Sequence, residues 1–279
     1  SIRYSVGLGF SVHELFKENY FSMPININYT KGIYSPLYKP GSDIVLGSIN
    51  STPEYLQKLN DSINLSTSIK TMLSDFYKDN LFYEYLLDNA KITYNYKWDQ
   101  SSNTTILNKE TIYIKTAFDY ALTFDQNNTW SPFKKLFSGN QWKYDSDSSF
   151  IKFLSDLNFY YTPQNLSFNA SLVDQDNYTV QRGINGSVTD DKNLDLQRNF
   201  QTNIKLHETF SLKYTVAMKN NLNDFRLNNT KIKLSDFFDL SFSPGLKKSY
   251  GEQYAFTYTP NYFSWLGPRF TYTPNYNWT

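Results

Sequence analysis

The chain has 279 residues and a nearly balanced charge, with 27 Lys+Arg against 26 Asp+Glu, and 18% of its residues are aromatic. This ring content excludes a disordered chain, and the balanced charge argues against a phosphate-binding nucleic-acid protein. The absence of cysteine excludes disulfide scaffolds and thiolate metal sites. The mean hydropathy is −0.56, and no apolar run approaches the about 20 residues of a membrane-spanning helix. A β-rich protein remains, either soluble or a membrane barrel.

Strict alternation of large apolar with small or polar residues is the strongest signal in the sequence. It begins at residues 2–12, returns at 112–124, and is equally clear at 210–218. Shorter runs of the same kind occur at 92–98, 157–161, 166–172, 200–206, 238–242 and 254–258. A period of two is typical of strands with two different faces, and it predicts about ten to thirteen strands with few helices.

We expect residues 1–279 to form a single β-barrel segment. Two insertions interrupt its alternation. The first lies around 50–88, where Thr52-Pro53-Glu54 resembles a helix start, and we expect one or two short helices or an ordered loop there. The second lies around 128–150. Its stretch 130–137 is either a short amphipathic helix near an interface or a loop with ordinary aromatic packing.

The connections between the expected strands also alternate in length. Tight turns are predicted at 163–165 and 207–208, and long polar loops at 173–199 and 219–233. Short turns at one end of the strands and long loops at the other are typical of bacterial outer-membrane barrels.

The same alternation fits a soluble β-sandwich or a barrel whose apolar face meets lipid. Tyr and Trp gather at membrane interfaces, and the excess of Tyr over Leu and Val favours the membrane barrel. The expected interface aromatics are Tyr94, Tyr96, Trp98, Tyr262, Trp265, Tyr276 and Trp278. The expected lipid-facing residues are Phe210, Leu212, Tyr214 and Val216.

Signals for catalysis are weak. The chain has two histidines, His13 and His207, and no G-x-S-x-G motif. The pairs Asp145/Asp147 and Asp174/Asp176 do not continue into a calcium-binding loop. We therefore expect no catalytic, cofactor-binding or metal-binding residues, and no enzymatic activity. Exposed rings on a soluble β-face that binds glycans are an alternative of a different class.

One stretch resembles the SprA family, the very large outer-membrane barrels of the type IX secretion system. It runs from Met23-Pro24-Ile25-Asn26-Ile27-Asn28-Tyr29-Thr30 into Tyr34-Ser35-Pro36-Leu37-Tyr38-Lys39-Pro40-Gly41-Ser42-Asp43-Ile44. The family-like positions are Pro24, Tyr29, Pro36, Tyr38, Pro40 and Asp43. Further similar motifs follow in order at 154–168, 196–200 and 262–278.

The resemblance implies an antiparallel transmembrane β-barrel, of which this chain is a stretch of wall from a longer protein. The implied function is secretion of folded proteins across the bacterial outer membrane, in some bacteria with gliding motility. The implied partners are outer-membrane lipid, secreted proteins, and secretion subunits that plug the channel or bind its lateral gate. Another large transporter barrel, of the lipopolysaccharide-assembly or TonB-dependent type, is the alternative within membranes.

Overall fold

A computed structural model describes most of the chain. The described residues are 1–17, 20–36, 38, 45, 53–77, 80–124, 129–131, 158–183, 186–224, 245–259 and 269–278.

The described part of the chain is all-β, as the alternation predicts, and its strands are antiparallel. The strands are β1 (Ile2–Ser11), β2 (Phe21–Ser22), β3 (Pro24–Tyr34), β4 (Lys58–Thr71), β5 (Ala90–Ser102), β6 (Ile106–Thr123), β7 (Thr129–Trp130), β8 (Phe159–Tyr160), β9 (Asn165–Gln181), β10 (Val188–His207), β11 (Phe210–Asn221), β12 (Leu246–Tyr258), β13 (Phe270–Tyr272) and β14 (Asn275–Trp278). The main sheet follows the order β1-β3-β4-β5-β6-β9-β10-β11-β12-β13, with β2 beside β4 and β14 beside β12, and β7 pairs with β8 separately.

The helical elements with described bounds are three short turns: η1 (Val12–Leu15), η2 (Glu54–Leu56) and η3 (Tyr83–Leu87). Residues 81–82 and 223–224 are also helical. None of the helices in the described residues is long and apolar enough to cross a bilayer.

The chain divides into two compact units. The first contains Ser1–Tyr120, Asn169–Arg198 and Lys219–Lys248, and the second contains Ala121–Phe168, Asn199–Met218 and Ser249–Thr279. Strands β6, β9, β10, β11 and β12 contribute to both.

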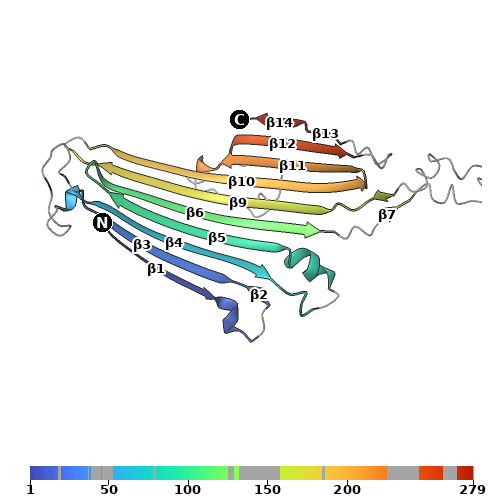
Figure 1. The fold of residues 1–279 in the computed structure, drawn as a ribbon, viewed down its shortest axis with the longest axis horizontal. Coiled ribbons are helices and arrows are strands. Elements are labelled where there is room, and N and C mark those ends of the chain that lie inside the picture. The colour runs from blue at the N-terminus through green and yellow to red at the C-terminus, as the bar shows by residue number, and fades with distance from the viewer. Residues whose placement is uncertain are drawn as a thin grey trace, which may run out of the picture. The chain divides into compact units, whose positions relative to one another are not determined.

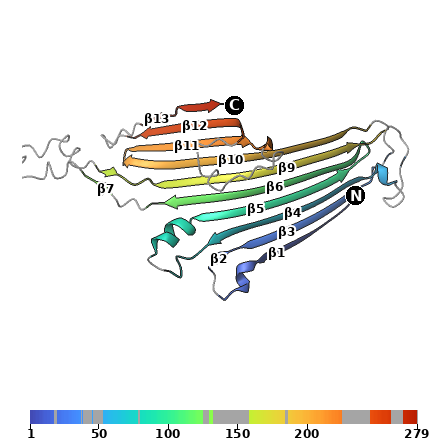
Figure 2. The same ribbon diagram turned by 180° about the vertical axis from the view of Figure 1, so that it is seen from behind.

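In the first unit, β1, β3, β4, β5 and β6 lie side by side (Figure 1). Their pairing is regular over long stretches: ten residue pairs join β1 to β3, and twelve join β4 to β5. Because paired residues of neighbouring strands point to the same side of a sheet, this register places every residue of these strands on one of two faces. The turns η1 and η3 follow β1 and β4, and they lie at the same end of the strands (Figure 2).

The sequence interpretation of 50–88 is partly wrong. The helix-start signal corresponds to a single 3-10 turn at Glu54–Leu56, and the fourteen residues Lys58–Thr71 form β4. Asp61 and Thr67 interrupt the apolar alternation of this strand, so its period was difficult to recognise. Antiparallel pairing with β3 on one side and β5 on the other defines it as a strand.

The prediction of a long polar loop at 173–199 is also wrong, because β9 continues to Gln181 and β10 begins at Val188. Backbone pairing extends these strands through residues whose side chains are too polar to suggest a strand.

The prediction that short turns lie at one end of the strands and long loops at the other fails in the first unit. At the same end of the strands, residues 35–57 join β3 to β4 while 103–105 join β5 to β6.

In the second unit, the tight turn predicted at 207–208 is confirmed, because β10 ends at His207 and β11 begins at Phe210. Trp130 belongs to the short strand β7. The centroid of its ring lies 6.3 Å from that of Phe159 on β8. Residues 132–137 of the helix considered at 130–137, most of the expected insertion at 128–150, and the strand expected at 238–242 lie outside the described residues.

Candidate functional site: the two faces of the sheet

One face of the first unit carries a continuous apolar surface, which we call the apolar belt. The register places its members on the same side of five strands: Val6, Leu8 and Phe10; Ile25, Ile27 and Tyr29; Ile63 and Leu65; Ile92, Tyr94, Tyr96 and Trp98; and Ile112, Ile114 and Phe118. Val6, Leu8, Phe10 and Ile92 are exposed, at 65%, 58%, 45% and 48%, and the other members are half-buried. Soluble monomers rarely leave a contiguous apolar surface that spans several strands uncovered.

A row of polar side chains ends the belt on one side. Lys31, Asp61, Gln100 and Glu110 are consecutive partners across four strands on the same face. Lys31 Nζ lies 3.6 Å from an Asp61 carboxylate oxygen, and Trp98 Nε1 donates a hydrogen bond of 2.7 Å to Glu110 Oε1. Trp98 therefore has an apolar ring in the belt and a polar edge at its border, the arrangement typical of an interface tryptophan.

Exposed apolar loops lie at the opposite end of these strands, around η1 and η3. Their exposed residues are Leu15, Phe16, Tyr20, Phe76, Tyr77, Leu81, Phe82, Tyr85 and Leu86. The rings of Tyr20 and Phe76 pack with centroids 4.6 Å apart, which joins the two loops. Both ends of the belt thus differ from its centre, one by charge and the other by clustered rings.

Asp88 holds the second of these loops in place. Its carboxylate accepts hydrogen bonds from the backbone N–H groups of Leu73 and Ser74, at 2.8 and 2.7 Å. Burial alone would raise the pKa of Asp88, but the hydrogen bonds from Ser74 and Leu73 outweigh it and lower the pKa below its ordinary value. The loop therefore depends on an ionised carboxylate.

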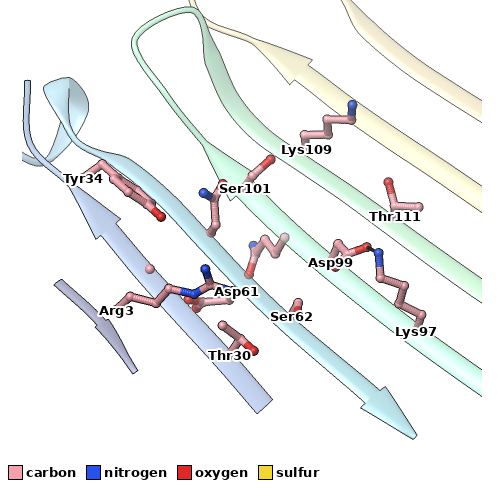
Figure 3. A pocket seen from close by; sticks show the side chains of 13 residues that line it. Arg3, Thr30, Tyr34, Asp61, Ser62, Lys97, Asp99, Ser101, Lys109 and Thr111 are labelled. Carbon is pink, nitrogen blue, oxygen red and sulfur yellow. Dashed lines mark ion pairs between the residues drawn. The ribbon is translucent and has the colours of Figure 1, made fainter. Parts of the chain in front are cut away.

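The opposite face of the first unit is polar and contains a cavity of about 540 Å³. Its wall is formed by β1, β3, β4, β5 and β6, and Figure 3 shows the lining side chains. These are hydroxyl, amide and charged groups with one ring: Arg3, Thr30, Gly32, Tyr34, Asn60, Asp61, Ser62, Lys97, Asp99, Gln100, Ser101, Lys109 and Thr111. By register, Asp61 and Gln100 belong to the polar row of the belt face, and the other eleven residues lie on the polar face. Such a surface is suited to water and polar ligands.

A buried charge cluster lies elsewhere in the first unit, where β10, β11 and β12 meet. The Asp195 side chain is 3% exposed, and its carboxylate lies 2.8 Å from Lys248 Nζ and 3.0 Å from Lys219 Nζ. Asn193 and Asn221 donate further hydrogen bonds to it, at 2.8 and 3.5 Å. This nearly buried carboxylate joins three strands and pairs with two lysines whose side chains are partly exposed.

The second unit has a ladder of aromatic rings. Phe200 contacts Tyr214 at 6.2 Å, Tyr214 contacts Tyr254 at 4.7 Å, and Phe256 contacts Phe210 at 6.5 Å. These residues come from β10, β11 and β12, so the rings follow the pairing of the strands. Cross-strand ring pairs of this kind stabilise a sheet and form a broad apolar surface.

The expected interface aromatics are placed as follows. Tyr94, Tyr96 and Trp98 share the belt face of β5, and Trp98 alone of these three borders the polar row. On β14, Tyr276 and Trp278 are 59% and 45% exposed. Tyr262 and Trp265 lie outside the described residues.

Three of the four expected lipid-facing residues, Phe210, Leu212 and Tyr214, are half-buried. The fourth, Val216, is 4% exposed. The protein itself covers this side chain, so the expectation for Val216 is wrong. Alternation gives the side of a strand on which a residue lies, but not what is packed against that side.

The family-like positions are only partly described. Pro24 opens β3, where proline is tolerated, and Tyr29 lies on the belt face of the same strand. Pro36 follows β3, and Tyr38 forms an isolated bridge with Val45. Pro40 and Asp43 lie outside the described residues.

No known protein-family model matches this chain, and no curated protein matches its sequence. Within the described ranges, no group of three or more His, Asp or Glu side chains is placed to hold a metal ion.

Sequence reasoning missed the polar row and the cavity. A signal for the row was present, because Lys31, Asp61, Gln100 and Glu110 each lie two positions from a belt residue, where alternation calls for an apolar side chain. The cavity has no such signal, because it depends on residues from five strands.

Proposed function

We propose that this chain forms part of the wall of a bacterial outer-membrane β-barrel, with the apolar belt in lipid and the polar face toward a water-filled interior. The observation that carries the proposal is a continuous apolar face, exposed or half-buried along its whole length, with two distinct borders. A soluble β-protein would bury such a face in a core.

The dimensions of the belt support this assignment. Ala90 extends the belt face of β5 by one row beyond Ile92, and from Ala90 to Trp98 there are eight residue steps, which at about 3.4 Å each give about 27 Å along the strand. Barrel strands tilt by about 40°, so this length projects to about 21 Å, and the aromatic loops extend the apolar surface beyond Ala90. The apolar band of outer-membrane barrels is about 25 Å tall.

We further propose that the complete wall belongs to a protein-conducting channel of the SprA kind, which secretes folded proteins. This step rests on the sequence resemblance. In the described residues β1 pairs with β3 alone. An unpaired strand edge in lipid is costly, so the wall requires neighbouring strands from the rest of the barrel. Its partners would be lipid, the secreted proteins, and subunits that plug or gate the channel.

An arginine substitution tests the lipid assignment. Leu8 lies one row further from the polar border than Val6 and is already exposed. Leu8→Arg would therefore have little effect in water, whereas in lipid it costs about 2–4 kcal/mol near the midplane. Ser5→Arg, on the opposite face of the same strand, is the matched control and is expected to cost less than about 1 kcal/mol. Unfolding in lipid vesicles measures both. Equal costs, or a protein that stays in the aqueous phase without detergent, would contradict the proposal and favour a soluble β-protein.

Cross-linking tests the protein-conducting role separately. The chain has no cysteine, so Ser62→Cys provides a unique attachment site for a photocross-linker on the polar face. In secreting cells we expect it to capture secreted proteins, while Leu65→Cys on the belt face captures none. If neither position captures secreted proteins while the arginine test succeeds, the chain belongs to another kind of barrel.

A further inference from the structure

The cavity on the polar face has a regular construction. The register aligns Arg3, Gly32, Asn60, Ser101 and Lys109 as consecutive partners across β1, β3, β4, β5 and β6. The three inner residues of this row are small or medium in size, and the two outer ones are long cations. Short side chains therefore form the floor and long ones the two ends (Figure 3).

A second row lies beside the first and completes the floor. It contains Thr30, Ser62, Asp99 and Thr111, again as consecutive partners. The hydroxyl groups of this row both donate and accept hydrogen bonds. The floor is thus rich in small polar groups.

The cavity has an excess of positive charge that its own residues do not neutralise. Asp99 forms an ion pair of 2.6 Å with Lys97, and Asp61 pairs with Lys31. No carboxylate of the described residues forms an ion pair with Arg3 or Lys109. The two cations are four strands apart, about 19 Å between their backbones at about 4.8 Å per strand. A ligand that satisfies both must carry separated negative charges or span the cavity.

Tyr34 supplies an aromatic wall. A side chain at Gly32 would meet the Tyr34 ring at 3.1 Å, so the glycine leaves room for the ring over the backbone. Tyr34 is 38% exposed and lines the cavity. Its ring is therefore available for stacking.

We propose that this cavity binds an acidic oligosaccharide. The Arg3 guanidinium and the Lys109 ammonium bind carboxylate groups on separate sugars, because charge-assisted hydrogen bonds are the strongest contacts available here. The hydroxyl and amide groups of the floor bind the sugar hydroxyls, and the Tyr34 ring stacks on a sugar face. An extended peptide fits less well, because no apolar pocket for its side chains exists among the lining residues. The site requires only the polar face, so it does not depend on the membrane proposal.

Binding of trigalacturonate to the full chain in detergent, measured by calorimetry, tests the proposal. Arg3→Gln and Lys109→Gln are each expected to weaken binding about tenfold, the loss of one charge-assisted contact. Tyr34→Leu is expected to weaken it about threefold to tenfold. Lys91→Gln is the matched control, because Lys91 lies on the same face outside the cavity, and binding is expected to remain unchanged.

Two comparison probes complete the experiment. Maltotriose has the sugar hydroxyls without the charge, and hexaglutamate has the charge without the sugars. Both are expected to bind at least tenfold more weakly than trigalacturonate. Equal binding of hexaglutamate, equal loss with Lys91→Gln, or trigalacturonate binding that survives both cation substitutions would overturn the proposal. Circular dichroism of each variant establishes that the sheet is intact.

Discussion

The buried carboxylate of Asp195 gives the sharpest stability prediction. Asp195→Asn keeps the size of the side chain but removes the charge that pairs with Lys219 and Lys248. Removing one partner of a buried ion pair costs about 3–5 kcal/mol. The two lysine side chains are 39% and 38% exposed and regain water, so the lower end applies, and we expect a loss of about 3 kcal/mol.

The same strand offers a matched control. Asp190 pairs with Lys192 at 3.2 Å, but these side chains are 48% and 50% exposed. Asp190→Asn is therefore expected to cost less than about 1 kcal/mol, as exposed ion pairs do. Both substitutions remove one negative charge from β10, so net charge cannot account for a difference between them.

Equilibrium unfolding in guanidinium chloride, with the protein in detergent micelles, measures both costs. Guanidinium is itself a salt and screens exposed pairs, which reduces the effect of Asp190→Asn further. A gap of at least about 2 kcal/mol is expected between the variants. If the two lose the same amount of stability, or if Asp195→Asn loses less than about 1 kcal/mol, burial does not govern this cluster and the reasoning is wrong.

Three further predictions concern single groups. Because the pKa of Asp88 is lowered in the folded protein, its stabilisation is complete above about pH 4 and is lost as the pH falls through the folded pKa. Acid titration of unfolding should therefore bring the native protein and Asp88→Asn together at low pH, and a constant gap would contradict this. Gly245 has φ +68°, and an added Cβ would meet the Asn221 carbonyl oxygen at 2.0 Å. Gly245→Ala should cost about 1–3 kcal/mol in thermal unfolding, against less for Gly9→Ala, and equal costs would refute the steric reason. Trp98→Phe removes the hydrogen bond to Glu110 and should cost about 1–2 kcal/mol in denaturant; an unchanged midpoint would show that this bond contributes nothing.

The predictions for the two faces and for the buried cluster are independent of one another. The arginine test concerns the environment of the belt, the oligosaccharide test concerns the cavity, and the Asp195 test concerns packing among β10, β11 and β12. Each uses a control on the same strand or the same face. A failure of one therefore leaves the other two inferences intact.

The sequence by itself determined that the chain is all-β, and it located most of the long strands. Alternation at 2–12, 112–124 and 210–218 is a local property, because successive side chains of any strand point to opposite faces. The tight turn after His207 is equally local. The alternating runs that became β10 and β11 are separated by only a few residues, so the connection between them has to be short.

Only the tertiary structure decided which strands are neighbours and what each face does. Backbone pairing with neighbouring strands forms the polar ends of β9 and β10 and the interrupted strand β4. This pairing does not depend on the pattern of side chains, so the sequence did not predict it. Lys31, Asp61, Gln100 and Glu110 are far apart in the sequence and become one row through register. The cavity between Arg3 and Lys109 arises in the same way. Burial of Val216 likewise depends on what packs against its strand. Contacts between distant segments, unlike alternation, have no period that a single sequence can display.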